Sequence, residues 1–196
     1  MHVTVIIPTY NEAKNIGGLI SQIRAVSPEV DILVADDNSP DGTGKIVQEF
    51  ALRDSKVRLF AREGKEGLGA AYIAAFKKVL EDTSITHIVM MDSDFSHSPL
   101  VLPKMLEEAK KFDLVVGSRY VRGGATVGWE LWRRALSYWG NFYAKTVAGL
   151  PIHDCTGGFN AISIAKLREL DLDKINATGY AFIMGLKFRL IKAGAT

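Results

Sequence analysis

The regular alternation of short apolar runs with amphipathic segments over the first 118 residues most restricts the fold of this 196-residue chain. The apolar runs are rich in Val and Ile, as buried strands are, and the segments between them have helical periodicity. We expect strands at residues 3–7, 31–35, 57–61, 87–91 and 114–117, and helices at residues 13–25, 44–52, 70–80 and 100–110. This alternation predicts an α/β fold with a mainly parallel sheet flanked by helices.

The pattern changes after Tyr120. Glycines predict a loop at residues 123–128, an aromatic-rich helical stretch follows at 129–147, and a loop from Asp154 leads to a further strand. A last helix is expected at residues 180–192. A chain of 196 residues is long enough for one buried core, so we expect a single domain over residues 1–196.

Composition argues against several classes of protein. The 24 basic residues nearly balance the 22 acidic ones, for a net charge of +2, which does not support a nucleic-acid-binding protein. Cys155 is the only cysteine, so an intramolecular disulfide is impossible, and a structural role in a reducing compartment is expected. No secretory signal precedes the first strand, and no apolar run approaches the roughly 20 residues that span a bilayer. We therefore expect a soluble protein or one that lies on a membrane surface.

The most informative strand end is Asp92-Ser93-Asp94, which follows the apolar run at residues 88–91. Ligands of parallel α/β sheets bind beyond the carboxyl ends of the strands. Residues two apart in an extended strand point the same way, so both carboxylates can face one ligand. Their hard oxygen atoms suit a divalent metal that carries a diphosphate, although a solvated turn has the same composition. Taken alone, the motif leaves both interpretations open.

Polar residues also follow the first two strands. Tyr10 and Glu12 are expected at the mouth of a cleft, where the aromatic ring can contact a base. Asp36 and Asp37 are adjacent, and adjacent residues in a strand point to opposite faces. Only one of the two can therefore serve the cleft, and Asp37, at the strand tip, is the better candidate for a ribose or base contact.

Three known ligand motifs are excluded. The first strand is not followed by Gly-x-Gly-x-x-Gly, which argues against a Rossmann dinucleotide site. The glycine-containing loop at residues 64–69 lacks the spacing and the Ser or Thr of a P-loop, although a basic loop before a helix can still approach an anion. In an EF-hand register, His97 would stand at the turn glycine and Pro103 at the final glutamate, so a calcium loop is excluded.

Two further features lie after the fifth strand. Arg119 ends that strand, and an arginine at this rim is either a bidentate partner for phosphate or an ordinary surface residue. Trp129, Trp132 and Trp139 are the three tryptophans of the chain, and they lie among arginines and tyrosines at helical spacing. Such a helix suits a membrane interface or packs on the sheet, and the concentration of tryptophan favours interfacial contact.

In this order, these motifs resemble the inverting family-2 glycosyltransferases with the GT-A fold, and among them the dolichyl/polyprenyl-phosphate mannose synthases. The matching segments cover nearly the whole chain and lie at residues 8–12, 36–43, 67–72, 92–97, 117–120, 129–141, 154–159 and 179–182. The resemblance implies a metal-dependent transfer of mannose from GDP-mannose to a dolichyl or polyprenyl monophosphate. It also implies a cytoplasmic protein, peripheral on the cytoplasmic face of a membrane.

The resemblance further implies roles for parts of the chain. Residues 1–118 would form the nucleotide-sugar-binding half and residues 119–196 the acceptor-binding part. The nucleotide sugar would be held by Pro8, Tyr10, Glu12, Ala35, Asp37, Asp92, Ser93 and Asp94. The ligands of Mg²⁺ or Mn²⁺ would be Asp94, Ser96 and Asp92. The acceptor phosphate would be bound by Arg119, Arg133 and Ser137, and the catalytic set would be Asp92, Asp94, Arg119 and Arg133. Membrane contact would come from residues 129–143 or from a partner membrane subunit.

The expected chemistry needs little help from a general base. A lipid monophosphate has a second pKa near ~6, so it is already a dianion at neutral pH and its oxygen can attack directly. Asp154 is the remaining base candidate, and a structural or orienting role is favoured for it.

Two departures from the family pattern keep alternatives open. Residues 183–185 (Ile-Met-Gly) stand where relatives carry Gln and an acidic residue, and the chain stops at Thr196, before a further strand and a basic segment that relatives carry. The chain is therefore expected to be truncated at its carboxyl end relative to the family. The alternatives are a related transferase that uses UDP-glucose or another UDP-sugar, and a catalytically idle nucleotide-sugar-binding subunit.

Overall fold

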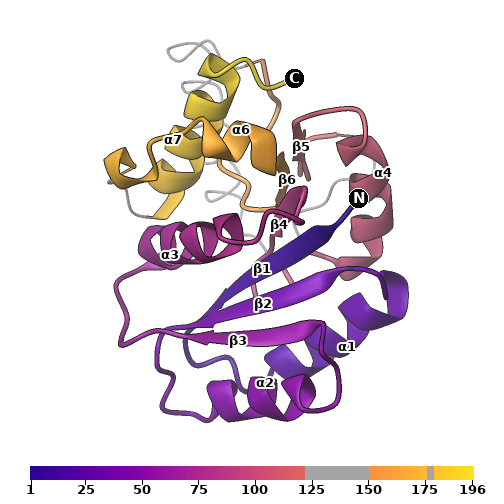
Figure 1. The fold of residues 1–196 in the computed structure, drawn as a ribbon, viewed down its shortest axis with the longest axis vertical. Helices are drawn as coiled ribbons and strands as arrows, with labels where there is room; N and C mark the ends of the chain where they lie inside the picture. Colours follow the sequence, from indigo (N-terminus) through magenta and orange to yellow (C-terminus); the bar gives the residue numbers. More distant parts are fainter. Residues whose placement is uncertain (122–150, 176–178) are drawn as a thin grey trace.

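The computed structural model of the protein describes residues 1–121, 151–175 and 179–196, and a six-stranded sheet of order β3-β2-β1-β4-β6-β5 forms its centre (Figure 1). The strands are β1 (Val3–Thr9), β2 (Asp31–Asp36), β3 (Val57–Ala61), β4 (His87–Met90), β5 (Leu114–Val116) and β6 (Asn160–Ser163). β1 pairs in parallel with β2 and β4, and β2 with β3, whereas β6 pairs antiparallel with β4 and β5. Among these described strands only β6 is reversed, so the prediction of a mainly parallel α/β sheet is confirmed.

Helices cover both faces of the sheet (Figure 1). On one face lie α1 (Ile16–Val26), α2 (Thr43–Ala51) and α4 (Leu102–Ala109), and on the other lie α3 (Leu68–Leu80), α6 (Ile164–Arg168) and α7 (Gly179–Lys192). Two 3₁₀ turns, η1 (Pro99–Val101) and η2 (Leu172–Lys174), complete the described elements. The expected helix at residues 13–25 begins three residues later, after a turn in which the Glu12 carbonyl accepts the N–H groups of Asn15 and Ile16, both at 2.9 Å.

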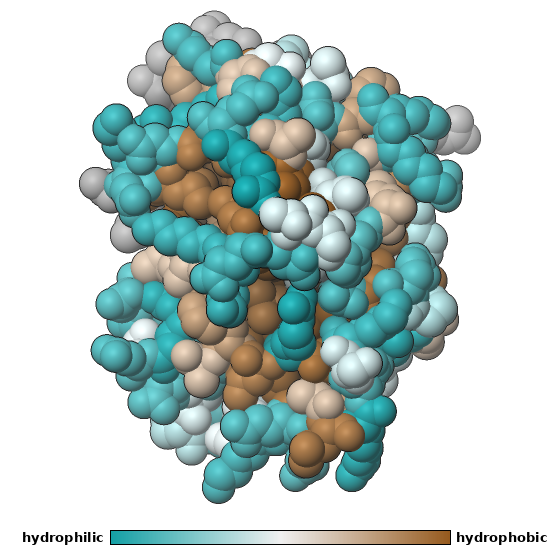
Figure 2. All heavy atoms as spheres, in the orientation of Figure 1, coloured by the Kyte–Doolittle hydropathy of each residue, from teal (hydrophilic) through white to brown (hydrophobic). Residues whose placement is uncertain are grey.

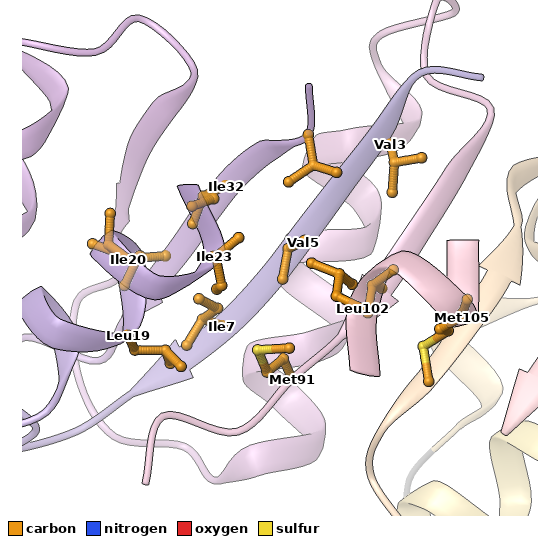
Figure 3. Close-up of a cluster of buried hydrophobic side chains, with 14 of the residues drawn as sticks. Val3, Val5, Ile7, Leu19, Ile20, Ile23, Ile32, Met91, Leu102 and Met105 are labelled. Atoms are coloured by element: carbon orange, nitrogen blue, oxygen red, sulfur yellow. The ribbon is translucent and has the colours of Figure 1, made fainter. Parts of the chain in front are cut away.

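The core has two layers because side chains alternate along the strands. Val3, Val5 and Ile7 of β1 lie in the layer under α1 and α4, whereas Ile6 lies in the layer under α3. Figure 3 shows the first layer, where the three β1 side chains meet apolar side chains of α1 and α4. Full burial of a Val or Ile side chain contributes about 1.5–3 kcal/mol, so these two layers stabilise the strand positions that carry the site.

The surface seen in the orientation of Figure 1 is mostly polar, with apolar atoms visible between the polar side chains (Figure 2). A cavity of about 130 Å³ is lined by Leu33, Arg58, Leu59, Phe60, Lys78, Val79, Asp82 and Ile85. These residues include the middle of β3, the end of α3 and the segment just before β4, and none of them belongs to the loops that follow β1, β2 or β4. None of the helices in the described part of the chain is long and apolar enough to cross a membrane.

Candidate functional site

The segments with unusual chemistry meet at one edge of the sheet. β1, β2, β4 and β5 run the same way, so their carboxyl ends share this edge, and the reversed β6 begins there. Outside glycine, Asn11, Asn38 and Phe95 have left-handed φ values of 62°, 56° and 62°, and each follows one of these strand ends. Such conformations cost about 1–3 kcal/mol each and cluster at functional sites, and for a bulky residue such as Phe95 they are rare. The backbone itself therefore marks this edge as a candidate site.

His97 holds the segment that contains Asp92. The Asp92 N–H donates to His97 Nδ1 at 2.9 Å, which places the ring proton on Nε2. That nitrogen faces Asp92 Oδ2 at 3.6 Å, and the ring stacks on Phe159 with centroids 5.1 Å apart. Burial lowers the pKa of His97, although Asp92 and Asp94 act against it. His97 is thus a neutral ring that orients Asp92.

The two aspartates of the motif differ in their surroundings. Burial raises the pKa of Asp92, and the charge of Asp94 raises it further, against the influence of His97. Asp94 is exposed and accepts the Ser96 N–H at 2.9 Å; burial raises its pKa, but hydrogen bonds from Ser96 lower it more. A cation between the two carboxylates would relieve their repulsion, and Mg²⁺-type sites use one or two protein carboxylates together with substrate phosphates. The donor set therefore fits a divalent cation.

The metal ligands themselves stay predictions. Across residues 1–121, 151–175 and 179–196, no group of three His, Cys, Asp or Glu side chains forms a candidate metal cluster. The structure does bring Asp92, Asp94 and Ser96 together in one loop after β4. Ser93, the fourth residue of this loop with an expected role, is buried.

The residues expected to hold the nucleoside line the ends of β1 and β2. Tyr10 is 37% exposed, and Lys65 Nζ lies 4.2 Å from the centre of its ring. Glu12 accepts the Asn15 side-chain N–H at 2.8 Å. Pro8 and Ala35 are register partners in β1 and β2, and both are buried. The nucleoside roles of these four residues stay predictions.

Asp37 has a partner that the sequence did not predict. Its carboxylate is ion-paired with Arg62, which also pairs with Glu66 at 2.5 Å. Asp36 serves the fold, because its carboxylate accepts hydroxyl hydrogen bonds of 2.8 and 2.6 Å within the strand-end loops. Arg62 could have been predicted near Asp37 from its position one residue after β3, at the same edge of the sheet.

Asp154 holds Arg119, one of the residues expected to bind the acceptor phosphate. Arg119 Nε and Nη2 donate to the two oxygen atoms of Asp154, each at 2.7 Å, and Nη2 also donates to Thr156 at 2.7 Å. Asp154 is fully buried; burial raises its pKa, but the Arg119 guanidinium lowers it more. These contacts are the ones expected of the structural or orienting role favoured for Asp154, and its part in the chemistry stays a prediction. The other expected acceptor residues, Arg133 and Ser137, and the tryptophans at 129, 132 and 139, lie outside the described residues.

Lys187 of α7 supports the same loop from inside. It is 1% exposed, and its Nζ donates to the carbonyl oxygens of Asp154 and Gly157, both at 2.8 Å. Burial lowers its pKa to about 8. Sequence reasoning missed this lysine, although it shares the i, i+3, i+4, i+7 spacing of the buried residues Ile183, Leu186 and Leu190.

The lowered pKa of Lys187 predicts a pH dependence of stability. Between about pH 8 and the ordinary value of 10.5, the unfolded chain holds a proton at this lysine that the folded chain has lost, so folding becomes more favourable as pH rises. The difference in unfolding free energy between the wild type and Lys187→Met should rise by about 3 kcal/mol over this range and stay flat below pH 7. Urea unfolding at a series of pH values measures it. If the unfolding free energies of the two proteins changed in parallel with pH, the lowered pKa of Lys187 would be contradicted.

Two glycines lie where neighbouring segments of the site are closely packed. A Cβ at Gly158 would lie 3.2 Å from His97 Cε1 and 3.6 Å from both carboxylate oxygens of Asp92. A Cβ at Gly117 would lie 2.7 Å from Phe159 Cδ1, which is closer than a real side chain permits. The loop that carries Asp154 is therefore packed directly against the loop that carries Asp92.

Comparison with known proteins identifies the family. The model of glycosyl transferase family 2 matches residues 4–171. The chain is 42% identical over 194 residues to an undecaprenyl-phosphate mannosyltransferase of Micrococcus luteus, covering 99% of this chain and 79% of the relative. It is 41% identical over 192 residues to a polyprenol monophosphomannose synthase of Mycolicibacterium smegmatis, covering 97% and 72%. A dolichol-phosphate mannosyltransferase of Pyrococcus furiosus is 36% identical over 191 residues, and the match covers 94% of this chain and 51% of that protein.

Solved structures agree on the fold. Glucosyl-3-phosphoglycerate synthase from Mycobacterium tuberculosis in complex with UDP superposes with a TM-score of 0.67 at 23% identity, covering 94% of this chain and 63% of that one. Its complex with Mn²⁺, UDP-glucose and phosphoglyceric acid gives a TM-score of 0.67 at 24% identity, with the same coverage. The chain thus spans less than two thirds of these structures. The protein belongs to glycosyl transferase family 2 and has the GT-A fold.

Proposed function

We propose that this chain is an inverting mannosyltransferase that moves mannose from GDP-mannose to a polyprenyl or dolichyl monophosphate. The observation that carries the proposal is the identity of 42% and 41%, over nearly the whole chain, to relatives named for mannose or phosphomannose and a polyprenyl carrier. Because the acceptor is a lipid, the proposal includes peripheral contact with the cytoplasmic face of a membrane, through residues 129–143 or a partner subunit.

The donor half of the proposal uses the ends of β1, β2 and β4. Tyr10, Glu12 and Asp37, with the backbone at Pro8 and Ala35, would hold the nucleoside. The loop at residues 92–96 would hold the diphosphate and Mg²⁺ or Mn²⁺, with Asp94 as the more exposed ligand and Asp92 set by His97. When bound, the cation would offset the negative charge that develops on the departing nucleoside diphosphate.

The acceptor half uses Arg119. Its guanidinium is fixed by the buried Asp154 and by Thr156, so its charge is preorganised before the acceptor phosphate arrives. A phosphate monoester is a dianion at neutral pH and needs no base to attack the anomeric carbon from the face opposite the leaving group. Arg133 and Ser137 would complete this phosphate site, and residues 119–196 would form the acceptor-binding part.

Transfer of radiolabelled mannose tests the proposal directly. The wild-type protein with GDP-[¹⁴C]mannose, Mn²⁺ and a short polyprenyl phosphate in detergent should yield a labelled lipid, and EDTA should abolish the product. Unlabelled GDP should inhibit more strongly than UDP, because the proposed donor carries guanosine. Labelling from UDP-glucose instead would show that the donor assignment is wrong. A folded protein that binds a nucleotide but labels no lipid would show an idle subunit.

A further inference from the structure

Side chains of the loop after β2 hold the loop after β1 through three consecutive backbone N–H groups. The bonds run from the Asn11 N–H to Ser39 Oγ at 3.0 Å, from the Glu12 N–H to Thr43 Oγ1 at 2.9 Å, and from the Ala13 N–H to Asp41 Oδ2 at 2.9 Å. We call Ser39, Asp41 and Thr43 the loop clamp. All three lie in the motif at residues 36–43, and none of them is expected to contact a ligand.

The members of the loop clamp also bind one another. The Thr43 hydroxyl donates to Asp41 Oδ1 at 2.6 Å, and the Thr43 N–H donates to the same oxygen at 3.0 Å. Thr43 is fully buried, so its single hydroxyl joins the Glu12 N–H to the Asp41 carboxylate inside the protein. The hydrogen bond from the Thr43 hydroxyl, and next that from the Ala13 N–H, lower the pKa of Asp41. Asp41 is therefore ionised at neutral pH and accepts these hydrogen bonds as a charged group, which makes them stronger than neutral ones.

Tyr10 is held on both sides by one carboxylate. The hydroxyls of Thr9 and Ser39 both donate to Asp36 Oδ1, at 2.8 and 2.6 Å. Thr9 precedes Tyr10, and Ser39 accepts the N–H of the residue that follows it. The Asp37 N–H in turn donates to the Thr9 carbonyl at 3.0 Å. Tyr10 and Asp37, two residues expected to hold the nucleoside, are thus joined by a continuous set of hydrogen bonds.

The loop clamp fixes the path of the backbone and leaves side chains to the ligand. It binds only the N–H groups of residues 11–13, so it does not use the side chains of Tyr10 and Glu12. N–H groups just before a helix commonly bind anions, and these three are already occupied. The left-handed conformation of Asn11, with φ 62°, is of the kind that persists only where surrounding contacts hold it.

We propose that the loop clamp positions the nucleoside part of the donor site by fixing Tyr10 and Glu12 relative to Asp37 before the nucleotide binds. A loop that is ordered in advance loses less conformational freedom on binding, which strengthens the binding. The bonds of the clamp join the loops after β1 and β2, whereas the diphosphate and its cation are proposed to lie at the loop after β4. The clamp therefore acts on the nucleoside and not on the diphosphate. The inference rests on the proposed function in placing a nucleotide beside Tyr10 and Asp37.

The test removes one hydroxyl of the loop clamp at almost constant volume. Thr43→Val leaves the Glu12 N–H without its acceptor, whereas Thr43→Ser keeps the hydroxyl. Thr86→Val is the control, because the exposed Thr86 hydroxyl also joins two segments, accepting the His2 N–H at 3.0 Å and donating to the His2 carbonyl at 2.9 Å. These atoms lie at the amino ends of β1 and β4, at the opposite edge of the sheet.

Isothermal titration compares GDP with inorganic pyrophosphate, each in the presence of Mn²⁺. Thr43→Val should weaken GDP binding by about tenfold and change pyrophosphate binding by less than about twofold. Thr43→Ser should restore the affinity for GDP to within about threefold of the wild type, and Thr86→Val should leave it unchanged. Circular dichroism checks that each variant is folded. If Thr43→Val does not fold, Ser39→Ala replaces it with the same expected result, because it removes the acceptor of the Asn11 N–H from a half-buried side chain.

The two ligands separate a positioning role from a general loss of stability. An unchanged affinity for GDP in the folded clamp variant overturns the inference, and so does an equal loss for GDP and pyrophosphate. An equal loss of GDP affinity in Thr86→Val overturns it as well. If the wild type binds UDP and not GDP, the proposed donor is wrong, and the same comparison made with UDP still decides the role of the clamp. A wild-type protein that binds neither nucleotide overturns the proposed function and this inference together.

Discussion

Replacing Asp94 by alanine should weaken Mn²⁺-dependent nucleotide binding by at least about 100-fold while the protein stays folded. The expected loss is large because Asp94 is the exposed carboxylate of the loop after β4, and even residues that only support metal ligands change metal affinity by about 10–100-fold. The fold loses only the 2.9 Å bond from the Ser96 N–H, which is worth about 0.5–1.5 kcal/mol. Isothermal titration with GDP and Mn²⁺ measures the nucleotide affinity, and urea unfolding measures the free energy of unfolding.

Asp82 provides a matched control for Asp94. It is partly exposed and likewise accepts the N–H of the serine two residues ahead, Ser84, at 2.9 Å, together with that serine's hydroxyl at 2.6 Å, but it lies before β4 rather than after it. Asp82→Ala should therefore cost at least as much stability as Asp94→Ala and leave nucleotide binding unchanged. Equal affinities of Asp94→Ala and the wild type would show that the metal assignment is wrong.

Replacing Arg119 by alanine should lower the free energy of unfolding by about 3–5 kcal/mol, as well as abolish transfer. The reason is that the carboxylate of the fully buried Asp154 would lose two hydrogen bonds of 2.7 Å and keep its charge in the interior. In the wild type this stabilisation is present above the ordinary carboxyl pKa of 3.8 and is lost as the pH falls below it, because the folded-state pKa of Asp154 is lowered. Urea unfolding at pH 7 measures the stability that the variant loses, and urea unfolding of the wild type at pH 3 measures the stability that is lost at low pH.

The double variant Arg119→Met/Asp154→Leu sharpens this test. When both charges are replaced by apolar side chains, no unpaired charge stays buried, so the loss should be much smaller than the sum of the two single losses. Lys110→Ala is the control, because Lys110 pairs with Glu107 at 2.6 Å where the side chains are 55% and 66% exposed, and it should cost far less stability than Arg119→Ala. Additive losses at Arg119 and Asp154 would contradict a coupled pair.

The parallel part of the fold was predictable because it depends on local pattern. Alternating apolar runs and amphipathic segments gave the five strands and the helices between them, and the expected last helix is α7. The direction of β6 was not predictable, since its four residues, Asn160–Ser163, show burial but not which strand they join. β6 pairs with β4, about 70 residues earlier in the chain, and only the folded core selects such a partner.

Contacts between segments distant in sequence also limited what could be predicted about the site. Residues that follow strands, such as Asp92 and Arg119, were predictable because strand ends share an edge. Residues that act through a contact across the sheet were not, and Lys187 and Arg62 are the examples. A lysine on a helix is ordinarily solvated, and only its place among apolar residues of the buried face distinguishes Lys187.

The close approach at Gly117 has a consequence for how donor preference can change. Phe159 fills the place of a Gly117 side chain, His97 stacks on Phe159, and Asp92 is held by His97. One added methyl group at position 117 would displace Phe159 and, through His97, the Asp92 carboxylate, without replacing any residue that is proposed to contact the ligand. Position 117 would therefore adjust the proposed diphosphate site from a distance, and variant libraries that seek a new sugar nucleotide should include it.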